Sequence, residues 1–183
     1  MERTVKQTAI KLSKEAAFIL LTVVCAVALP QLFHGAGVLL GIGGQLGQIF
    51  LPMYLPVMII GFYRGWIPGA VAGLLAPLFS FWMTQMPSAA LLPYITVELI
   101  ATGIFAGLLA NARYPAILRV LSVQALAKAV RLAAFVVGTC LINGNALTAT
   151  ALFAGITQSI PGLALQLIIV TALLMVKRKE NHD

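Results

Sequence analysis

The sequence has few charged residues and very few acidic ones. Charged residues make up 9% of the 183 residues, and Asp and Glu together number 5. A soluble domain carries about 25% charged residues. Together with a hydrophobic content of 61%, this composition excludes an ordinary soluble domain and indicates an integral membrane protein. The chain, residues 1–183, has the length of one domain with several spans of about 20 residues each.

Several chemical signatures are also missing. The two cysteines, Cys25 and Cys140, both lie in apolar runs, a placement that supports neither a disulfide framework nor a metal site. His34 has no second ligand at metal-binding spacing, so we expect no metal. The sequence lacks a P-loop ending in Gly-Lys-Ser/Thr and a Gly-x-Ser-x-Gly nucleophile motif. We therefore expect neither an enzyme nor a bound cofactor.

What the sequence does contain is a series of apolar segments separated by short connections. They cover residues 15–33, 48–63, 65–84, 91–110, 116–142 and 146–176, to within a few residues. These segments are apolar all round and longer than the alternating strands of a membrane barrel. For the first segment the alternative is a signal peptide with a cleavage site near residues 26–28, and cleavage would leave five spans.

Among the connections between the apolar segments, only alternate ones contain Lys or Arg. These residues are found in the N-terminal tail, at Arg64, at Arg113 and Arg119, and in the C-terminal tail, whereas residues 34–47, 85–90 and 143–145 contain none. Because cytoplasmic loops carry the excess of Lys and Arg, this alternation predicts an all-α membrane protein. We expect six transmembrane helices in a compact bundle in the cell membrane, with both termini cytoplasmic. The apolar, glycine-rich stretch 34–47 is expected to be a loop folded over the outer mouth, or else a plain flexible loop.

Charged residues inside the apolar segments are the main functional signal. Gln124, Lys128 and Arg131 share one face of the fifth segment, and Glu98 lies in the fourth with Tyr94 one turn above it. Charges at membrane depth point into the bundle or a wet cavity and are functional by default. One carboxylate cannot neutralise two cations, so an anionic ligand would complete the balance. The alternatives are a structural ion pair with the second cation reaching water, and a proton relay through Glu98.

Other polar residues of the outer half are candidates to complete a substrate pocket, although several are expected to be bystanders. Tyr54 and Trp82 have an alternative role as anchors at the membrane interface. Gln158 precedes Pro161 and Gly162, which we expect to interrupt the last helix. The candidate substrate-binding set is therefore Gln45, Gln48, Tyr54, Gln85, Tyr94, Glu98, Lys128, Arg131, Asn143 and Gln158.

The block "FLPMYLPVMIIGFYRGWIPGAVAGLLAPLFSFWMTQMP", residues 50–87, carries a resemblance to a known family. Its LPM…LPV run, the short second segment ending at Gly61, the Pro77-Leu78 pair and the Met86-Pro87 turn resemble the S components of energy-coupling factor (ECF) vitamin transporters. Gln85 stands where a glycine is frequent in that family. The likeness is sharpest over residues 50–109 and extends over the whole chain in length and in expected topology.

This resemblance implies a membrane-embedded subunit that captures a small water-soluble vitamin or precursor from outside. Such a subunit docks on an ECF transmembrane scaffold subunit with two cytoplasmic ATPase subunits, and it hydrolyses nothing itself. The surplus positive charge favours an anionic substrate, and the pantothenate class shares the LPM…LPV and Met-Pro features. An S component for a different vitamin such as cobalamin, and a ligand-free membrane assembly or scaffold protein, are the alternatives; a membrane-embedded enzyme ranks last because paired carboxylates are missing.

The resemblance also implies a scaffold-docking face on the first span. The family often uses an Ala-x-x-x-Ala pattern there, and this sequence departs from it. Small residues four positions apart, which let helices approach closely, are Ser13 with Ala17 and Thr22 with Ala26. Gly69, Gly73 and Ala76 in the third segment form another small face, for which packing inside the bundle is at least as good an explanation.

Overall fold

The computed structural model describes residues 2–41, 45–142 and 159–180, and every regular element in these ranges is a helix. The prediction of an all-α protein is therefore confirmed for this part of the chain. The helices are α1 (Glu2–Leu39), α2 (Gln45–Phe50), α3 (Tyr54–Arg64), α4 (Trp66–Thr84), α5 (Leu92–Leu108), α6 (Ala116–Ile142) and α8 (Ile160–Glu180).

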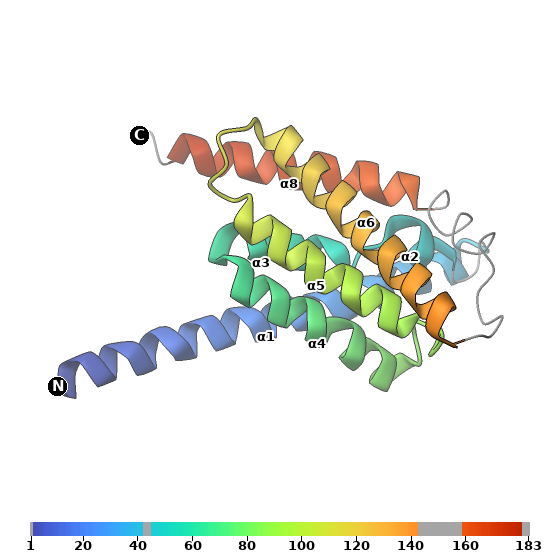
Figure 1. The fold of residues 1–183 in the computed structure, drawn as a ribbon, viewed down its shortest axis with the longest axis horizontal. Coiled ribbons are helices and arrows are strands. Elements are labelled where there is room, and N and C mark those ends of the chain that lie inside the picture. Colours follow the sequence, from blue (N-terminus) through green and yellow to red (C-terminus); the bar gives the residue numbers. More distant parts are fainter. Residues whose placement is uncertain (1, 42–44, 143–158, 181–183) are drawn as a thin grey trace.

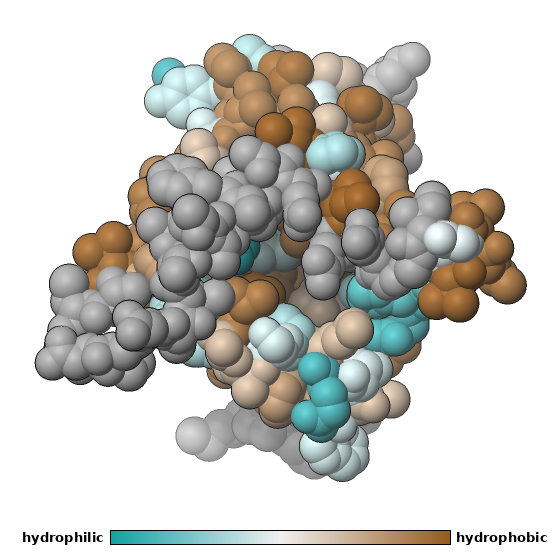
Figure 2. All heavy atoms as spheres, turned by 90° about the vertical axis from the view of Figure 1, so that its right-hand side faces the viewer, coloured by the Kyte–Doolittle hydropathy of each residue, from teal (hydrophilic) through white to brown (hydrophobic). Residues whose placement is uncertain are grey.

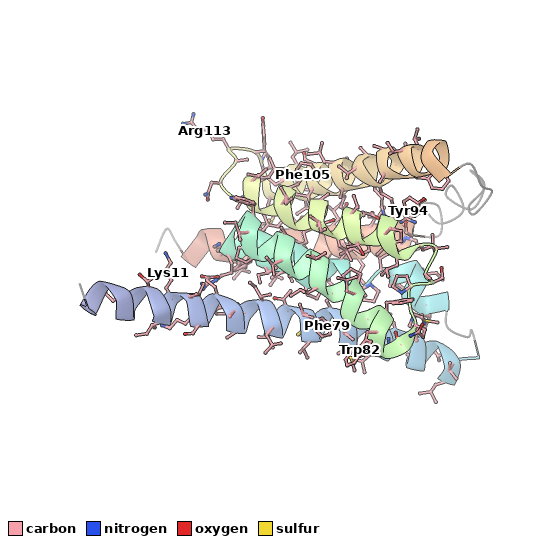
Figure 3. All side chains as sticks on the ribbon, turned by 60° about the horizontal axis from the view of Figure 1, so that its bottom comes forward. Lys11, Phe79, Trp82, Tyr94, Phe105 and Arg113 are labelled. Carbon is pink, nitrogen blue, oxygen red and sulfur yellow. The ribbon has the colours of Figure 1, made fainter. Side chains whose placement is uncertain are left out.

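The helices lie side by side as an elongated bundle, with the first half of α1 projecting beyond it (Figure 1). Both the start of α1 and the end of α8 lie at the same end of the bundle, which we call the terminal end; the opposite end is the distal end. Lys11 and Arg113, which belong to two different basic stretches of the sequence, both lie toward the terminal end (Figure 3). Arg64 of α3 pairs there with Glu15 of α1. The basic stretches of the sequence are thus gathered at one end.

Four helices are long and apolar enough to cross a membrane, namely those over Ile10–Leu39, Trp66–Thr84, Ala116–Gly138 and Ile160–Lys177. Helix α5, over Leu92–Leu108, is apolar but shorter. Helix α3 has 11 residues, a length of about 16 Å, and does not cross a hydrocarbon core of about 30 Å alone. These properties fit a membrane protein with several spans.

Several predicted boundaries differ from the structure. Helix α1 continues through residues 34–39, where a loop was expected, because glycine is tolerated in apolar helices and residues 38–40 keep the segment apolar. The expected second segment is interrupted at residues 51–53. Leu51 has a φ of 45° and is followed by Pro52, so the helix cannot continue there. Helix α8 begins at Ile160 with Pro161 in its first turn, while the earlier part of the expected sixth segment lies outside the described residues.

Helices α4 and α5 are in backbone contact. A Cβ atom on Gly69 would lie 2.5 Å from the carbonyl oxygen of Gly103, and a Cβ on Gly103 would overlap the backbone of Gly69 in return. One turn further, a Cβ on Gly73 would overlap the backbone of Leu99. The small face formed by Gly69, Gly73 and Ala76 therefore packs inside the bundle. We call this contact the glycine seam.

Candidate functional site

The most polar buried group of the described residues is an ion cluster formed by Glu98, Lys128, Arg131 and Tyr54. Glu98 of α5 is 1% exposed, and its Oε2 atom accepts hydrogen bonds from the Tyr54 hydroxyl at 2.7 Å and from Arg131 Nη1 at 3.0 Å. Its Oε1 atom lies 2.5 Å from Lys128 Nζ. Lys128 Nζ also lies 5.3 Å from the centre of the Tyr54 ring, within reach of a cation–π interaction. Both carboxylate oxygens are therefore already occupied.

The two cations keep donor capacity that Glu98 does not use. Arg131 Nε is buried and has no hydrogen-bond partner among the described residues. Lys128 Nζ is close enough to Glu98 for an ion pair, but the two groups do not meet with hydrogen-bond geometry, so the ammonium donors also lack an acceptor there. Two cations face one carboxylate, and one positive charge is left over. Because buried charges are normally paired and hydrogen-bonded, the cluster is suited to hold an additional anion.

The cluster is positioned by three helices. Tyr54 is the first residue of α3, Glu98 lies in the middle of α5, and Lys128 and Arg131 lie on α6. The inward direction predicted for the polar face of α6 is confirmed, because Gln124 and Arg131 are 9% and 8% exposed. Glu98 faces α3 and α6, while another side of α5 packs closely on α4 at the glycine seam.

A hydrogen-bond network adjoins the cluster on the side of α8. Gln124 Nε2 donates to the carbonyl oxygen of Leu163 at 3.0 Å, and Gln166 Nε2 donates to the carbonyl oxygen of Leu51 at 3.2 Å. The second bond satisfies a carbonyl in the break between α2 and α3, where the helical pattern is interrupted. Since Gln166 is 1% exposed, this network ties α8 to the start of α3, next to Tyr54.

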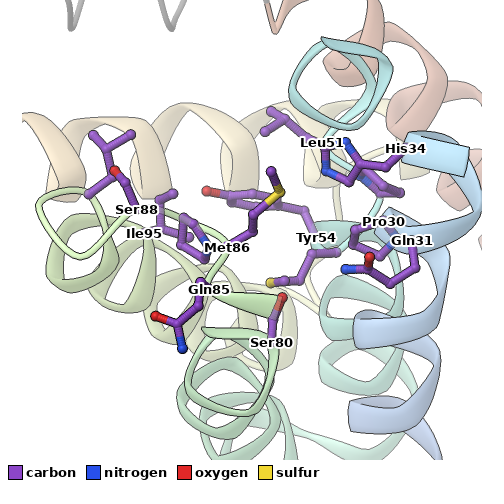
Figure 4. Close-up of a pocket in the computed structure, with 14 residues that line it drawn as sticks. Pro30, Gln31, His34, Leu51, Tyr54, Ser80, Gln85, Met86, Ser88 and Ile95 are labelled. Carbon is purple, nitrogen blue, oxygen red and sulfur yellow. The ribbon is translucent and has the colours of Figure 1, made fainter. Parts of the chain in front are cut away.

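A cavity of about 350 Å³ opens at the distal end between α1, α3, α4 and α5. Its polar lining residues include Gln31, His34, Tyr54, Ser80, Gln85 and Ser88, and Figure 4 shows Tyr54 between the α1 wall and the α4–α5 connection. Figure 2, which views the distal end, shows a central hollow with both hydrophilic and hydrophobic residues around it. Ligand pockets commonly measure about 300–1,000 Å³, so the cavity is of a size for a small molecule.

Tyr54 is the residue that the cavity and the ion cluster share. It lines the cavity, and its hydroxyl donates to Glu98. Glu98, Lys128 and Arg131 do not themselves line this cavity. Ile95, one turn before Glu98 on α5, is the other link between the two. The cavity and the cluster are therefore neighbours, with the Tyr54 side chain between them.

The other predicted binding residues have several different placements. Gln85 ends α4 with a φ of 57° and lines the cavity. Tyr94 packs against Phe135 of α6, with ring centres 5.6 Å apart, and its hydroxyl lies against Gly138. Trp82 is 76% exposed and is not among the described residues that line the cavity. The side chains of Gln45 and Gln48 and the whole of Asn143 and Gln158 lie outside the described part of the chain.

The predicted docking residues do not form one continuous exposed face on α1. Ser13 and Ala17 are exposed, Thr22 is half-buried, and Ala26 is fully buried in the core of the bundle. Because Ala26 already packs inside this chain, it is not available for contact with another protein. Thr22 lines an apolar groove of about 570 Å³ between α1 and α3, which ends near Arg64 and Lys177.

Sequence reasoning missed Gln31, His34 and Gln166. Gln31 and His34 line the cavity, and each has a buried nitrogen without a partner in the described structure. A signal was present for Gln166, a lone amide in the apolar run "LALQLII", of the same kind that identified Glu98. Gln31, a lone amide near the end of the expected first segment, carried the same signal, whereas His34 did not, because the first helix was expected to end near Phe33.

Comparison of the chain with models of protein families, with curated proteins and with solved structures found no match.

Proposed function

We propose that the chain is the substrate-binding S component of an ECF-type transporter and captures a small anionic vitamin or vitamin precursor from outside the cell. The observation that carries the proposal is the ion cluster, in which two buried cations share one carboxylate and keep unused donors. A carboxylate is the natural complement, since the planar guanidinium of Arg131 matches its geometry. Pantothenate, a small carboxylate, is the substrate we test first.

Two further properties of the distal cavity support the proposal, namely its size and its place in the bundle. The cavity of about 350 Å³ is near the lower end of the usual range for ligand pockets. It lies at the distal end, away from the basic terminal end that the positive-inside rule assigns to the cytoplasm. In this proposal all six apolar segments span the membrane and both termini are cytoplasmic. Cobalamin, a much larger molecule, fits this cavity less well.

The rest of the transporter is part of the proposal. A scaffold subunit with two ATPases would supply the energy, and the groove beside Thr22 is where we place contact with that scaffold. The purified chain alone should bind its substrate without concentrating it. Sustained accumulation of pantothenate in liposomes that contain only this chain would contradict the assignment as an S component.

Isothermal titration with pantothenate tests the binding role of Arg131. Arg131→Ala removes a charge-assisted contact of about 1.5–3 kcal/mol, so affinity should fall about ten- to a hundredfold. Arg131→Lys should recover only part of the loss, because a point charge lacks the planar fork. The neutral alcohol pantothenol should bind more weakly than pantothenate and should respond little to either substitution.

The competing function, a ligand-free assembly protein, makes the opposite prediction for the same titration. In that case Glu98, Lys128 and Arg131 form a purely structural cluster. Arg131→Ala would then change thermal stability only, and the parent chain would give no heat with pantothenate. Equal affinity of the parent and Arg131→Ala for pantothenate would likewise show that the cations do not hold the carboxylate.

A further inference from the structure

The α1 wall of the distal cavity carries polar atoms that the described contacts do not satisfy. Gln31 Nε2 and His34 Nδ1 are both buried, and neither has a hydrogen-bond partner among the residues that the structure describes. Both residues line the cavity. Buried polar groups without partners are rare in folded proteins and cost free energy, so each one calls for an explanation. Neither residue belongs to the ion cluster.

The geometry of α1 places these two groups together. Gln31 and His34 are three residues apart, so they project from the same face of the helix. Figure 4 shows both on the α1 side of the cavity, with the Tyr54 side chain extending away from them across the view. Tyr54 in turn contacts the ion cluster through its bond to Glu98. Tyr54 therefore lies between the α1 wall of the cavity and the ion cluster, and a ligand that contacts both must pass the Tyr54 side chain.

The hydrogen-bonding chemistry of Gln31 and His34 limits which ligand groups can bind beside them. The Gln31 amide nitrogen donates and its oxygen accepts, while His34 Nδ1 donates or accepts according to the tautomer. A hydroxyl group both donates and accepts, so it satisfies Gln31 in either orientation of the amide and His34 in either tautomer. The other wall residues include Met53, Leu91 and Ile95, which suit a compact apolar body carrying the hydroxyl. Among the described lining residues there is no Lys or Arg, so an uncharged polar group suits this part of the cavity.

We propose that Gln31 and His34 form a second subsite, which binds the hydroxyl-bearing end of a small carboxylate whose anionic end is held by Arg131 and Lys128. The inference rests on the proposed function, because it takes the ion cluster as the site of the anionic end. It adds that α1 contributes directly to substrate selection. It also defines the substrate class as a hydroxy acid with its hydroxyl remote from its carboxylate.

The test compares pantothenate with dideoxypantothenate, in which both hydroxyls are replaced by hydrogen. Isothermal titration of the parent should show about a tenfold preference for pantothenate, the effect expected of one or two neutral hydrogen bonds. In the double variant Gln31→Met/His34→Leu this preference should fall below about threefold, mainly through weaker binding of pantothenate. A purely structural role would lower the affinity for both compounds by the same factor and leave the preference unchanged.

Two variants serve as controls. Gln7→Met removes the same amide from an exposed position on the same helix and should keep the parent preference. His34→Asn, which places an amide close to the position of Nδ1, should keep most of it. Thermal unfolding of each variant in detergent confirms that the compared proteins are folded.

The outcomes separate this inference from the proposed function. Binding of pantothenate with an unchanged preference in Gln31→Met/His34→Leu would overturn the second subsite and leave the proposed function standing, with water as the partner of the α1 wall. A parent chain that binds neither compound would overturn the proposed function and the subsite with it. Loss of the preference in the double variant, with Arg131→Ala retaining it at lower affinity, is the result we expect.

Discussion

The two sides of α5 pack against their neighbours in opposite ways. Toward α4 the contact is bare backbone, where a Cβ on Gly69 would lie 2.5 Å from Gly103. Toward α6 and the start of α3 the contact includes buried charges, with Glu98 bridging Lys128, Arg131 and Tyr54. The glycine seam depends on the absence of side chains, whereas the ion cluster depends on the balance of three charges.

This difference separates the part of the helix that fixes the structure from the part that can exchange partners. A backbone contact has no substitute, because any added atom forces the helices apart. A charge contact can be re-formed with another anion, since a ligand carboxylate presents the same oxygens as Glu98. We therefore expect changes in the seam to affect stability alone, and changes in the cluster to affect both stability and binding.

The largest effect should come from removing the single carboxylate of the cluster. Glu98→Gln leaves Lys128 and Arg131 buried without a counter-charge, and breaking a buried pair in this way costs about 3–5 kcal/mol. The variant should unfold at a clearly lower temperature in detergent, while pantothenate should bind as tightly as before or more tightly and restore part of the lost stability.

Glu15→Gln is the matched control for that experiment. Glu15 pairs with Arg64 at the terminal end, where the side chains are 27% and 32% exposed. An exposed pair of this kind contributes about 0–1 kcal/mol, so the midpoint should move little. Equal destabilisation by Glu98→Gln and Glu15→Gln would show that the cluster is not electrostatically buried.

The next effect concerns the glycine seam. Gly103→Ala introduces a methyl group that overlaps the backbone of Gly69, and overpacking of this kind costs about 1–3 kcal/mol. Gly35→Ala is the control, because a Cβ there meets nothing within 4 Å. The midpoint of thermal unfolding should be lower for Gly103→Ala and nearly unchanged for Gly35→Ala. Any folded fraction of either variant should keep its affinity for pantothenate. Equal midpoints would mean that the close approach of α4 and α5 is dispensable.

The sequence predicts most of the helices because strong boundary signals flank them. Pro115 and the polar stretch after Ile142 delimit α6, and the structure has it over the predicted residues 116–142. The predicted end of the first helix was wrong. The glycines after Phe33 resemble those of a loop, but glycine is tolerated within an apolar helix. The break at 51–53 was not predicted, because Pro52 lies inside a run that is apolar throughout and no polar residue marks the interruption.

The candidate site was only partly predictable from the sequence, because charged residues give a stronger signal than neutral polar ones. Charges in an apolar run must find partners, so Glu98, Lys128 and Arg131 could be placed together from their types and depths. The hydroxyl of Tyr54 is a weaker signal, since tyrosine also anchors at membrane interfaces. Whether a neutral amide such as that of Gln31 is satisfied depends on which helices surround it, and the sequence alone does not contain that information.

The smallest effect should come from Tyr54, where the cavity meets the cluster. Tyr54→Phe removes the 2.7 Å hydrogen bond to Glu98 and keeps the ring that lies under Lys128. Glu98 still pairs with both cations in this variant. We therefore expect the free energy of unfolding to fall by about 1.5 kcal/mol, near the lower end of the range for hydrogen bonds to charged groups. In the Glu98→Gln background the same substitution should cost less, since the charged acceptor is gone. Tyr114→Phe, at a side chain 60% exposed, should change the midpoint little. An equal loss of stability on Tyr54→Phe in both backgrounds would show that the Tyr54 hydroxyl acts independently of the Glu98 carboxylate. Tyr54 would then not belong to the ion cluster.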